Sequence, residues 1–325
     1  MRFCVPKVKI RLRSLLTWNA CSPILLREED PPDRMRDAYL ILCHNRPAQI
    51  NALAAHFGAG GHDVYIHVDA KSTIAHLIRT NASIRLITPP SDVVWGGWTQ
   101  VEAMLKLLSA AMNSGRTYRY LHLLSGQCMP LLSPATLDAR LDEAAASNTQ
   151  FIECEPLPRR IWDDFDGGLH RAEIYFPAFF VSKYTNLHRD FFWPYIRMWK
   201  RLGLRRPLYR QYAPFFGGAQ WFSLTQDCVR ALFAAMRREP GLVRFFRHTF
   251  CSDELFFPTL LARTDYRARA AGNGRYLRWP GGDVKYSPDT LRPEDWPAAL
   301  ASGYLFGRKF ELEAQECTRF LSQLP

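Results

Sequence analysis

The stretch DAYLILCHNRPAQINALAAHF, residues 37–57, predicts the fold class of this chain. It begins with AYLILCH (38–44), an apolar run typical of a strand that is buried on both faces. Pro47 can then begin a helix, because the first helical position needs no backbone N–H donor. A buried strand followed directly by a helix is the repeating unit of a parallel α/β sheet.

The next segments repeat this pattern. HDVYIHVD (62–69) predicts a second strand, KSTIAHLIRT (71–80) a short helix and IRLIT (84–88) a third strand. We therefore expect an α/β fold with a mainly parallel central sheet flanked by helices. Ligands of such sheets bind beyond the carboxyl ends of the strands. The polar residues expected at those ends are His44, Asn45, Asp69 and Lys71.

Two more strands are predicted farther along. One lies in YRYLHLLSGQCMPL (118–131) and breaks at Ser125-Gly126-Gln127, and the other is FIECE (151–155). Before them, VVWGGWTQVEAMLKLLSAAM (93–112) predicts a tight Gly-Gly turn followed by a periodic helix. Trp95 in this turn either stacks on a flat ligand ring or packs in the core, where glycine lets two backbones approach. The residues alone leave both interpretations open.

The chain has 325 residues, of which 47% are hydrophobic and 22% charged, a balance typical of a globular protein with a sizeable core. Its formal net charge of +11 favours phosphates, nucleotides, acidic polymers or an anionic membrane as partners, without choosing among them. Residues 1–36 hold eight Lys and Arg residues against four acids. We expect this segment to be a loosely ordered basic extension and residues 37–325 to be the folded domain.

Eight cysteines are spread along the chain without a C-x-x-C motif or paired spacing. They favour neither a zinc site nor a disulfide framework, so we expect a reducing, cytoplasmic location. No run of about 18 apolar residues exists to span a membrane, and the N-terminus lacks the apolar region and cleavage site of a signal peptide. A peripheral position on the inner face of the membrane stays open.

The stretch CSDELFFPTLL (251–261) places Asp253 and Glu254 directly before an apolar run with helical spacing. Acids in the first turn of a helix are ordinarily explained by capping and by the helix dipole. A carboxylate in this position can also serve as a general base. On its own, the stretch favours the structural interpretation.

Seven segments together resemble one enzyme family, and they occur in the family's order. They are HNRP (44–47), YIHVDAKS (65–72), VVWGGWTQVEA (93–103), YLHLLSGQCMPL (120–131), GGAQWFSLT (217–225), SDELFFPTLL (252–261) and LFGRKFE (305–311). From about residue 37 to about residue 313 the chain resembles the core-2/I-branching β-1,6-N-acetylglucosaminyltransferases and the related peptide O-xylosyltransferases. The resemblance implies a GT-A-type fold, with residues 37–155 as the nucleotide-binding half and residues 156–325 as the acceptor-binding and catalytic half.

The same resemblance implies an inverting transfer from UDP-N-acetylglucosamine or UDP-xylose to a glycan or protein hydroxyl, without a metal cofactor. Glu254 matches the family's general base, and Arg308 and Lys309 match the cations that grip the diphosphate. A guanidinium beside an ammonium can do the electrostatic work of a metal ion there. The residues expected at the uridine are His44, Asn45, Asp69 and Trp95, and those expected at the sugar or acceptor are Glu155, Arg160, Gln220, Trp221 and Asp253.

Some features depart from the family or compete with this interpretation. Asp164-Phe165-Asp166 is a D-x-D string of the kind that holds a metal in many GT-A enzymes, but no clear apolar strand precedes it, so we expect no metal there. Gln220 stands where the peptide xylosyltransferases carry an acid, which argues against a peptide acceptor. In contrast, RKFE (308–311) and FFPT (256–259) look closer to the xylosyl branch.

The segment FFWPYIRMWKRLGLRRPLYRQYAP (191–214) carries six basic residues, seven aromatics and no acid. Such interleaving fits a nucleic acid, an acidic glycan, an anionic membrane, or an ordinary amphipathic helix with snorkelling arginines. No nucleic-acid fold motif accompanies it, so we expect no nucleic-acid partner. The leading hypothesis is a sugar transferase, with a peptide O-xylosyltransferase-like enzyme and a non-catalytic glycan- or nucleotide-binding module as alternatives.

Overall fold

A computed structural model describes residues 35–162, 166–181, 186–279 and 287–325. Nearly all of the expected basic extension therefore lies outside the described residues, and the boundary at residue 37 stays a prediction. In the described part, no helix has both the length and the apolar character that crossing a membrane requires. Six cysteines are described there, and no disulfide joins any two of them.

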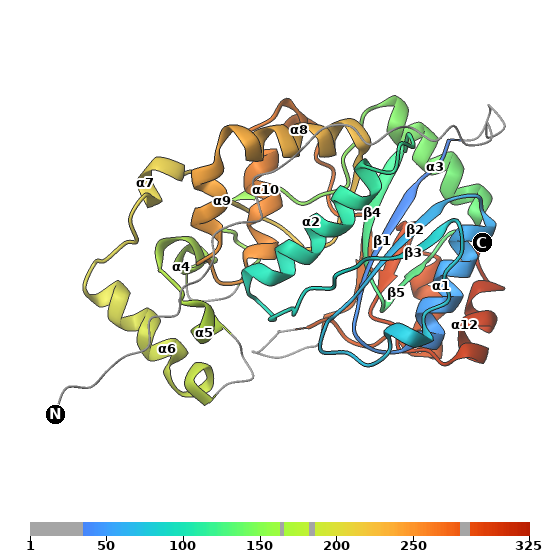
Figure 1. The fold of residues 1–325 in the computed structure, drawn as a ribbon, viewed down its shortest axis with the longest axis horizontal. Coiled ribbons are helices and arrows are strands. Elements are labelled where there is room, and N and C mark those ends of the chain that lie inside the picture. Colours follow the sequence, from blue (N-terminus) through green and yellow to red (C-terminus); the bar gives the residue numbers. More distant parts are fainter. Residues whose placement is uncertain (1–34, 163–165, 182–185, 280–286) are drawn as a thin grey trace. The chain divides into compact units, whose positions relative to one another are not determined.

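The central sheet has five strands in the order β3-β2-β1-β4-β8 (Figure 1). Parallel pairs join β1 to β2 and β4, and β2 to β3, whereas β8 runs antiparallel to β4. The strands are β1 (Ala38–Cys43), β2 (Asp63–Val68), β3 (Ile84–Leu86), β4 (Tyr120–Ser125) and β8 (Ser223–Thr225). The predicted α/β class with a mainly parallel sheet is confirmed.

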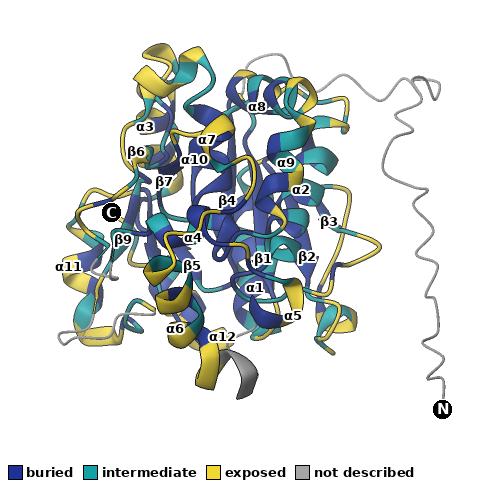
Figure 2. Cartoon of the chain, turned by 90° about the vertical axis from the view of Figure 1, so that its left-hand side faces the viewer, coloured by how far each residue is buried: buried dark blue, intermediate teal, exposed yellow. Residues whose placement is uncertain are grey.

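Alternation along the buried strands sends side chains into two separate cores, because successive residues of a strand point to opposite faces. Leu40 and Leu121 join the core on one face, while Tyr39, Ile41 and Leu124 join the core on the other. Helices α2, α8, α9 and α10 cover the first face, and α1, α3, α11 and α12 contribute to the second (Figure 1). Strands β1, β2 and β4 are almost entirely buried (Figure 2).

The helices on the first face are α2 (Trp98–Met112), α8 (Gln226–Arg238), α9 (Pro240–Phe246) and α10 (Phe256–Leu261); those on the second are α1 (Pro47–Ala59), α3 (Pro134–Ala146), α11 (Trp296–Leu300) and α12 (Ala314–Leu321). A third core, built around Phe176, Phe192 and Phe250, packs α5 (Ala178–Val181) against α6 (Asn186–Arg201). The neighbouring short helices α4 (Leu169–Glu173) and α7 (Tyr209–Tyr212) contribute Ala172 and Tyr212 to the first core.

Two small sheets complete the fold. One has the order β5-β10-β9, built from β5 (Cys128–Pro130), β10 (Phe306–Arg308) and β9 (Arg275–Leu277). The other pairs β6 (Glu155–Pro156) with β7 (Phe216–Gly217). The strand predicted in 118–131 breaks at Ser125-Gly126-Gln127 as predicted, and Cys128 to Pro130 beyond the break pair with β10 as a separate strand.

Two local predictions were wrong. Residues 71–80 form no α-helix. Their helical structure is a single 3₁₀ turn, Ala75–Leu77, and no residue of that turn is buried. Of residues 71–80 Ile78 alone is buried, so the segment gains too little from packing to offset the cost of helix nucleation. The predicted strand 151–155 is reduced to a bridge from Phe151 to Ser223 and to the start of β6 at Glu155.

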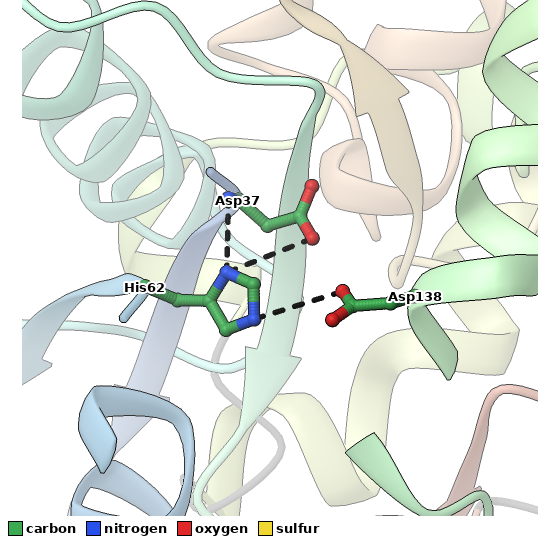
Figure 3. A group of neighbouring side chains, drawn as sticks. All are labelled: Asp37, His62 and Asp138. Carbon is green, nitrogen blue, oxygen red and sulfur yellow. Dashed lines mark hydrogen bonds and ion pairs between the residues drawn. The ribbon is translucent and has the colours of Figure 1, made fainter. Parts of the chain in front are cut away.

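A buried ion-pair network joins β1 to β4 and α3. The Arg119 guanidinium lies 2.5 Å from Asp37 Oδ2 and 2.8 Å from Asp138 Oδ1. Asp37, Asp138 and His62 lie close enough together to resemble metal ligands (Figure 3). However, Arg119 already neutralises the carboxylates, and His62 Nδ1 accepts a hydrogen bond from the Asp37 amide at 3.1 Å. We therefore assign this group to stability and not to metal binding.

Replacing Arg119 with Met should lower the free energy of unfolding by about 3–5 kcal/mol, because it leaves the fully buried Asp37 carboxylate without its cation. Urea unfolding followed by circular dichroism measures this change. Arg230→Met is the matched control, since Arg230 pairs with Asp227 on the exposed surface and should matter by less than about 1 kcal/mol. Equal losses in the two variants would contradict the structural role.

Candidate functional site

The carboxyl ends of β1, β2 and β4 meet at one edge of the sheet. The Asp69 amide donates to Cys43 O at 2.9 Å, and the Gly126 amide donates to Leu42 O at 2.8 Å. Ser125 at the end of β4 pairs with Leu42 in the parallel register. The residues that follow these three strands therefore lie close together, as expected for a ligand site of a parallel sheet.

The four residues predicted to contact uridine lie at or beside this edge. His44 and Asn45 are exposed directly after β1. The Asp69 carboxylate accepts a hydrogen bond from the Lys71 amide at 3.0 Å and pairs with the Lys71 ammonium at 3.2 Å. Trp95 is half-buried, with its ring edge-on to Phe250 at 6.0 Å between centroids.

The loop that carries Trp95 connects the Asp69 edge to Glu254. At one end, the Val93 amide lies 3.4 Å from Asp69 Oδ1. At the other end, the Cys251 amide donates to Gly96 O at 2.8 Å. Cys251 adopts a left-handed conformation (φ 47°), which turns the chain into the 3₁₀ turn Ser252–Glu254. Glu254 is thereby positioned on the same side of the sheet as the nucleotide candidates.

Glu254 is held by an arginine that the sequence did not identify. Arg171 Nη1 lies 2.5 Å from Glu254 Oε2, and the Glu254 side chain remains 35% exposed. The Arg171 guanidinium stacks on Trp162 with its central carbon 4.1 Å from the ring centroid. No hydrogen bond to Glu254 Oε1 exists among the described residues, so Arg171 fixes one carboxylate oxygen while the other has no donor in this part of the chain.

Two glycines make room for the Trp162 ring. A Cβ atom at Gly168 or at Gly217 would collide with the indole. Gly168 also has a positive φ of 83°, which disfavours any other residue at this position. Trp162 can therefore lie flat beneath Arg171, and Arg159 stacks on the same indole at 4.7 Å.

Asp253 is not the helix cap that its position suggests, because α10 begins only at Phe256 and has no side-chain cap. Its side chain is buried and accepts a hydrogen bond from Gln100 of α2 at 3.1 Å. Burial, reinforced by the neighbouring Glu254 charge, raises the pKa of Asp253 to about 7. Asp253 thus links the turn that carries Glu254 to α2. The interpretation of Asp253 as a helix cap did not predict this contact.

Arg308 lies at the same strand edge as the nucleotide candidates. Its guanidinium donates to Ser125 Oγ and lies over the Trp221 ring at 4.8 Å. Burial lowers the pKa of Arg308 from its ordinary value. Trp221 is itself buried, so the ring predicted at the acceptor supports the guanidinium from below.

The neighbouring Lys309 is paired with an acid. Its ammonium lies 3.0 Å from Glu311 Oε1, while Arg46 holds the other oxygen of Glu311 at 3.1 Å. The ion pairs with Lys309 and Arg46 lower the pKa of Glu311. Arg46 follows Asn45 directly, so this cluster ties the C-terminal segment to the end of β1.

The sugar and acceptor candidates are only partly brought together. Glu155 in β6 is exposed and pairs with Arg159 at 3.2 Å, whereas Arg160 is exposed and has no polar contact among the described residues. The Gln220 amide lies 4.0 Å from the Met104 sulfur. Whether these three residues contact a substrate stays a prediction.

Glu153 is more centrally placed than the predicted Glu155. It pairs with Arg159 at 2.8 Å and accepts hydrogen bonds from the Ala219 amide at 3.1 Å and the Asn273 side chain at 2.8 Å. It also lines a cavity of about 600 Å³ together with Asn273, Tyr276 and Tyr304. The loose spacing of the charged residues near the predicted strand 151–155 did not distinguish Glu153 from Glu155 as the candidate.

The D-x-D string is only partly described, since Asp164 and Phe165 lie outside the described residues. Asp166 pairs with His170 Nδ1 at 2.8 Å and with the Lys200 ammonium at 2.7 Å. Burial opposes its ionisation, but the hydrogen bonds from His170 and Lys200 lower the pKa of Asp166 below the usual range. His170 and Lys200 already occupy the Asp166 carboxylate, so the described aspartate of the string makes contacts within the protein.

Replacing Asp253 with Asn should flatten the dependence of stability on pH. Because the pKa of Asp253 is about 7 in the folded protein and near 3.8 when exposed, the folded state retains a proton that the unfolded state releases between these values. The unfolding free energy of the parent protein should therefore fall by up to roughly 4 kcal/mol as pH rises from about 4 to about 7. The variant lacks this contribution.

Urea unfolding at pH 5 and pH 8 measures the effect, with Asp265→Asn as an exposed control on a 3₁₀ turn. The stability of Asp253→Asn relative to the parent should be higher at pH 8 than at pH 5. Parallel pH profiles for the two proteins would show that Asp253 does not titrate in this range.

Comparison with known proteins identifies the relatives of the chain. A family model described as Core-2/I-Branching enzyme matches residues 38–300. The chain is 26% identical over 304 residues to "Xylosyltransferase oxt" of Drosophila pseudoobscura pseudoobscura and 27% identical over 306 residues to the protein of that name from Drosophila melanogaster. Each alignment covers 86% of this chain and 32% of the relative, so the chain spans about a third of these relatives.

The described architecture agrees with this match. A mostly parallel central sheet flanked by helices is consistent with a GT-A-like glycosyltransferase fold. The matched region includes both the strand-edge residues and Glu254, whereas Arg308 and Lys309 follow it. The chain belongs to the Core-2/I-Branching enzyme family.

Proposed function

We propose that the chain is an inverting glycosyltransferase that moves N-acetylglucosamine or xylose from a UDP-sugar to an acceptor hydroxyl. In this proposal Glu254 is the general base, and no divalent metal is required. The observation that carries the proposal is the geometry of Glu254, one carboxylate oxygen of which is fixed by Arg171 while the other faces no donor among the described residues. Membership of the family supports the reaction class.

The role of Glu254 follows from the chemistry of a single displacement. The acceptor hydroxyl must lose its proton as its oxygen attacks the anomeric carbon, so a base must lie within hydrogen-bond reach. With Oε2 held at 2.5 Å by Arg171, Oε1 is the atom that would take this proton. The stacking of Arg171 on Trp162 would keep the base in one orientation while the acceptor enters.

Arg308 and Lys309 are proposed to stabilise the departing diphosphate. A buried guanidinium that is already fixed by Ser125 and Trp221 provides charge without reorganisation, which is the most effective way to stabilise a developing anion. Lys309 would exchange its partner Glu311 for a phosphate oxygen. Together these two cations would supply the positive charge that a metal ion supplies in other glycosyltransferases.

The choice between the two sugars rests on the relatives. Both matched Drosophila proteins are named as xylosyltransferases, which favours UDP-xylose as the donor. The family name favours branching of a glycan, and Gln220 replaces an acid of the peptide xylosyltransferases, which favours a glycan acceptor. We therefore propose a glycan hydroxyl before a protein hydroxyl as the acceptor.

One UDP-sugar should stabilise the protein against heat, and the stabilisation should survive EDTA. A ligand at about a hundred times its dissociation constant adds about 2.7 kcal/mol to the unfolding free energy, which a thermal-shift assay detects readily. The panel is UDP, UDP-N-acetylglucosamine, UDP-xylose and UDP-glucose, each with EDTA and with manganese. A shift that requires manganese would contradict the metal-free proposal, and no shift with any member would contradict donor binding.

Glu254→Gln should leave donor binding unchanged and lower the transfer rate by about a hundredfold or more, the range expected for loss of a positioned base. Release of UDP in the presence of acceptor measures the rate, and the thermal shift measures donor binding. Glu294→Gln, which removes an exposed carboxylate from a different segment, is the control and should transfer normally. Normal turnover by Glu254→Gln would exclude Glu254 as the base.

A further inference from the structure

Helix α6 carries an apolar stripe that the fold does not cover. Phe191, Met198 and Leu202 are 56%, 47% and 62% exposed. At 3.6 residues per turn these three positions lie on one line along the helix, which continues past Arg201 because the Leu202 amide donates to Met198 O at 3.0 Å. We call Phe191, Met198 and Leu202 the α6 stripe.

The stripe is distinct from the face that anchors α6. Phe192 and Ile196 point the other way and are buried in the third core. Phe180 of α5 packs on Phe192 with 6.3 Å between ring centroids, while its neighbour Phe179 is 71% exposed. Figure 2 shows exposed residues along α6. The anchoring face is thus already satisfied, and the stripe with Phe179 forms an additional apolar surface.

Cations flank the stripe. Arg197 and Arg201 are one turn apart on the adjoining face and exposed, and no acidic residue pairs with either in the described part of the chain. The one acid of α6, Asp190, is paired with Arg189 at 2.8 Å. Glu173 of α4 is likewise paired with Lys200 and Arg205. The surface around the stripe is therefore both apolar and positively charged.

We propose that this surface docks peripherally on an anionic membrane. An apolar stripe beside exposed arginines is the arrangement of a helix that lies in the membrane interface, with its apolar side chains at the acyl boundary and its cations at the phosphates. Each arginine near such a surface adds to the attraction. A nucleic acid would match the arginines but would leave Phe191, Met198 and Leu202 in water, so the lipid surface fits better.

The docking surface is mechanically linked to the candidate site through α4. Lys200 of α6 reaches Glu173 of α4 at 2.5 Å, and the same short helix carries Arg171, which holds Glu254. Docking would hold the transfer site next to the lipid surface, where a membrane-borne acceptor glycan would be available. This last step rests on the proposed function, whereas the docking itself does not.

The test is co-sedimentation of the full chain with two kinds of vesicle, phosphatidylcholine alone and phosphatidylcholine with about a third phosphatidylglycerol. We expect sedimentation with the anionic vesicles only, and less of it as salt increases. Arg197→Gln with Arg201→Gln should lower the partition coefficient about 25-fold, because each cation near an anionic surface contributes about fivefold. Phe191→Ser with Leu202→Ser should also lower binding to the anionic vesicles, because it removes apolar side chains from the stripe.

Matched controls separate α6 from the rest of this basic chain. Arg237→Gln with Arg238→Gln removes two exposed cations from the end of α8, and Leu77→Ser removes an exposed apolar side chain from the 3₁₀ turn Ala75–Leu77. Both controls should bind like the parent. Absence of sedimentation, or sedimentation that both α6 variants retain, would overturn the proposal. Because no sugar donor is present, the outcome does not depend on whether the proposed transfer occurs.

Discussion

The site depends on the parallel pairing of β1 with β2 on one side and with β4 on the other. In this register Leu42 lies opposite both His67 and Ser125, so three strands end at the same level. Everything proposed to bind the donor is positioned from this edge, Asp69 directly after β2 and Arg308 through its hydrogen bond to Ser125. A one-residue slip of β4 would turn Ser125 to the other face and remove the support of Arg308.

The sheet could be predicted from the sequence because its information is local. AYLILC and DVYIHV are buried runs of strand length, and every residue of β2 is indeed buried. The helix predicted over 71–80 does not form, since of these residues Ile78 alone is buried in the core. Asp253 shows a further limit of prediction from local sequence. Its place before an apolar run predicts a cap, but its burial beside Gln100 depends on a contact across 153 residues.

The same limit applies to the candidate site. Glu254, Arg308 and Lys309 could be proposed because they stand in motifs that resemble a family, whereas Arg171 stands in no motif. Its pairing with Glu254 spans 83 residues and exists only after α4 has folded against the 3₁₀ turn. Helix α4 thus has two roles, since Arg171 contacts the proposed base and Glu173 contacts α6.

The packing of Trp162 has a consequence for how relatives of this chain can diverge. The indole lies between two positions that tolerate no Cβ atom, Gly168 and Gly217, which belong to separate segments of the chain. Exchange of the tryptophan for a smaller residue would remove the clash with the indole at both positions, but the positive φ of Gly168 would still disfavour a side chain there. Trp162 and Gly217 are therefore expected to vary together in an alignment, and a lineage that has lost both must orient its carboxylate by another means.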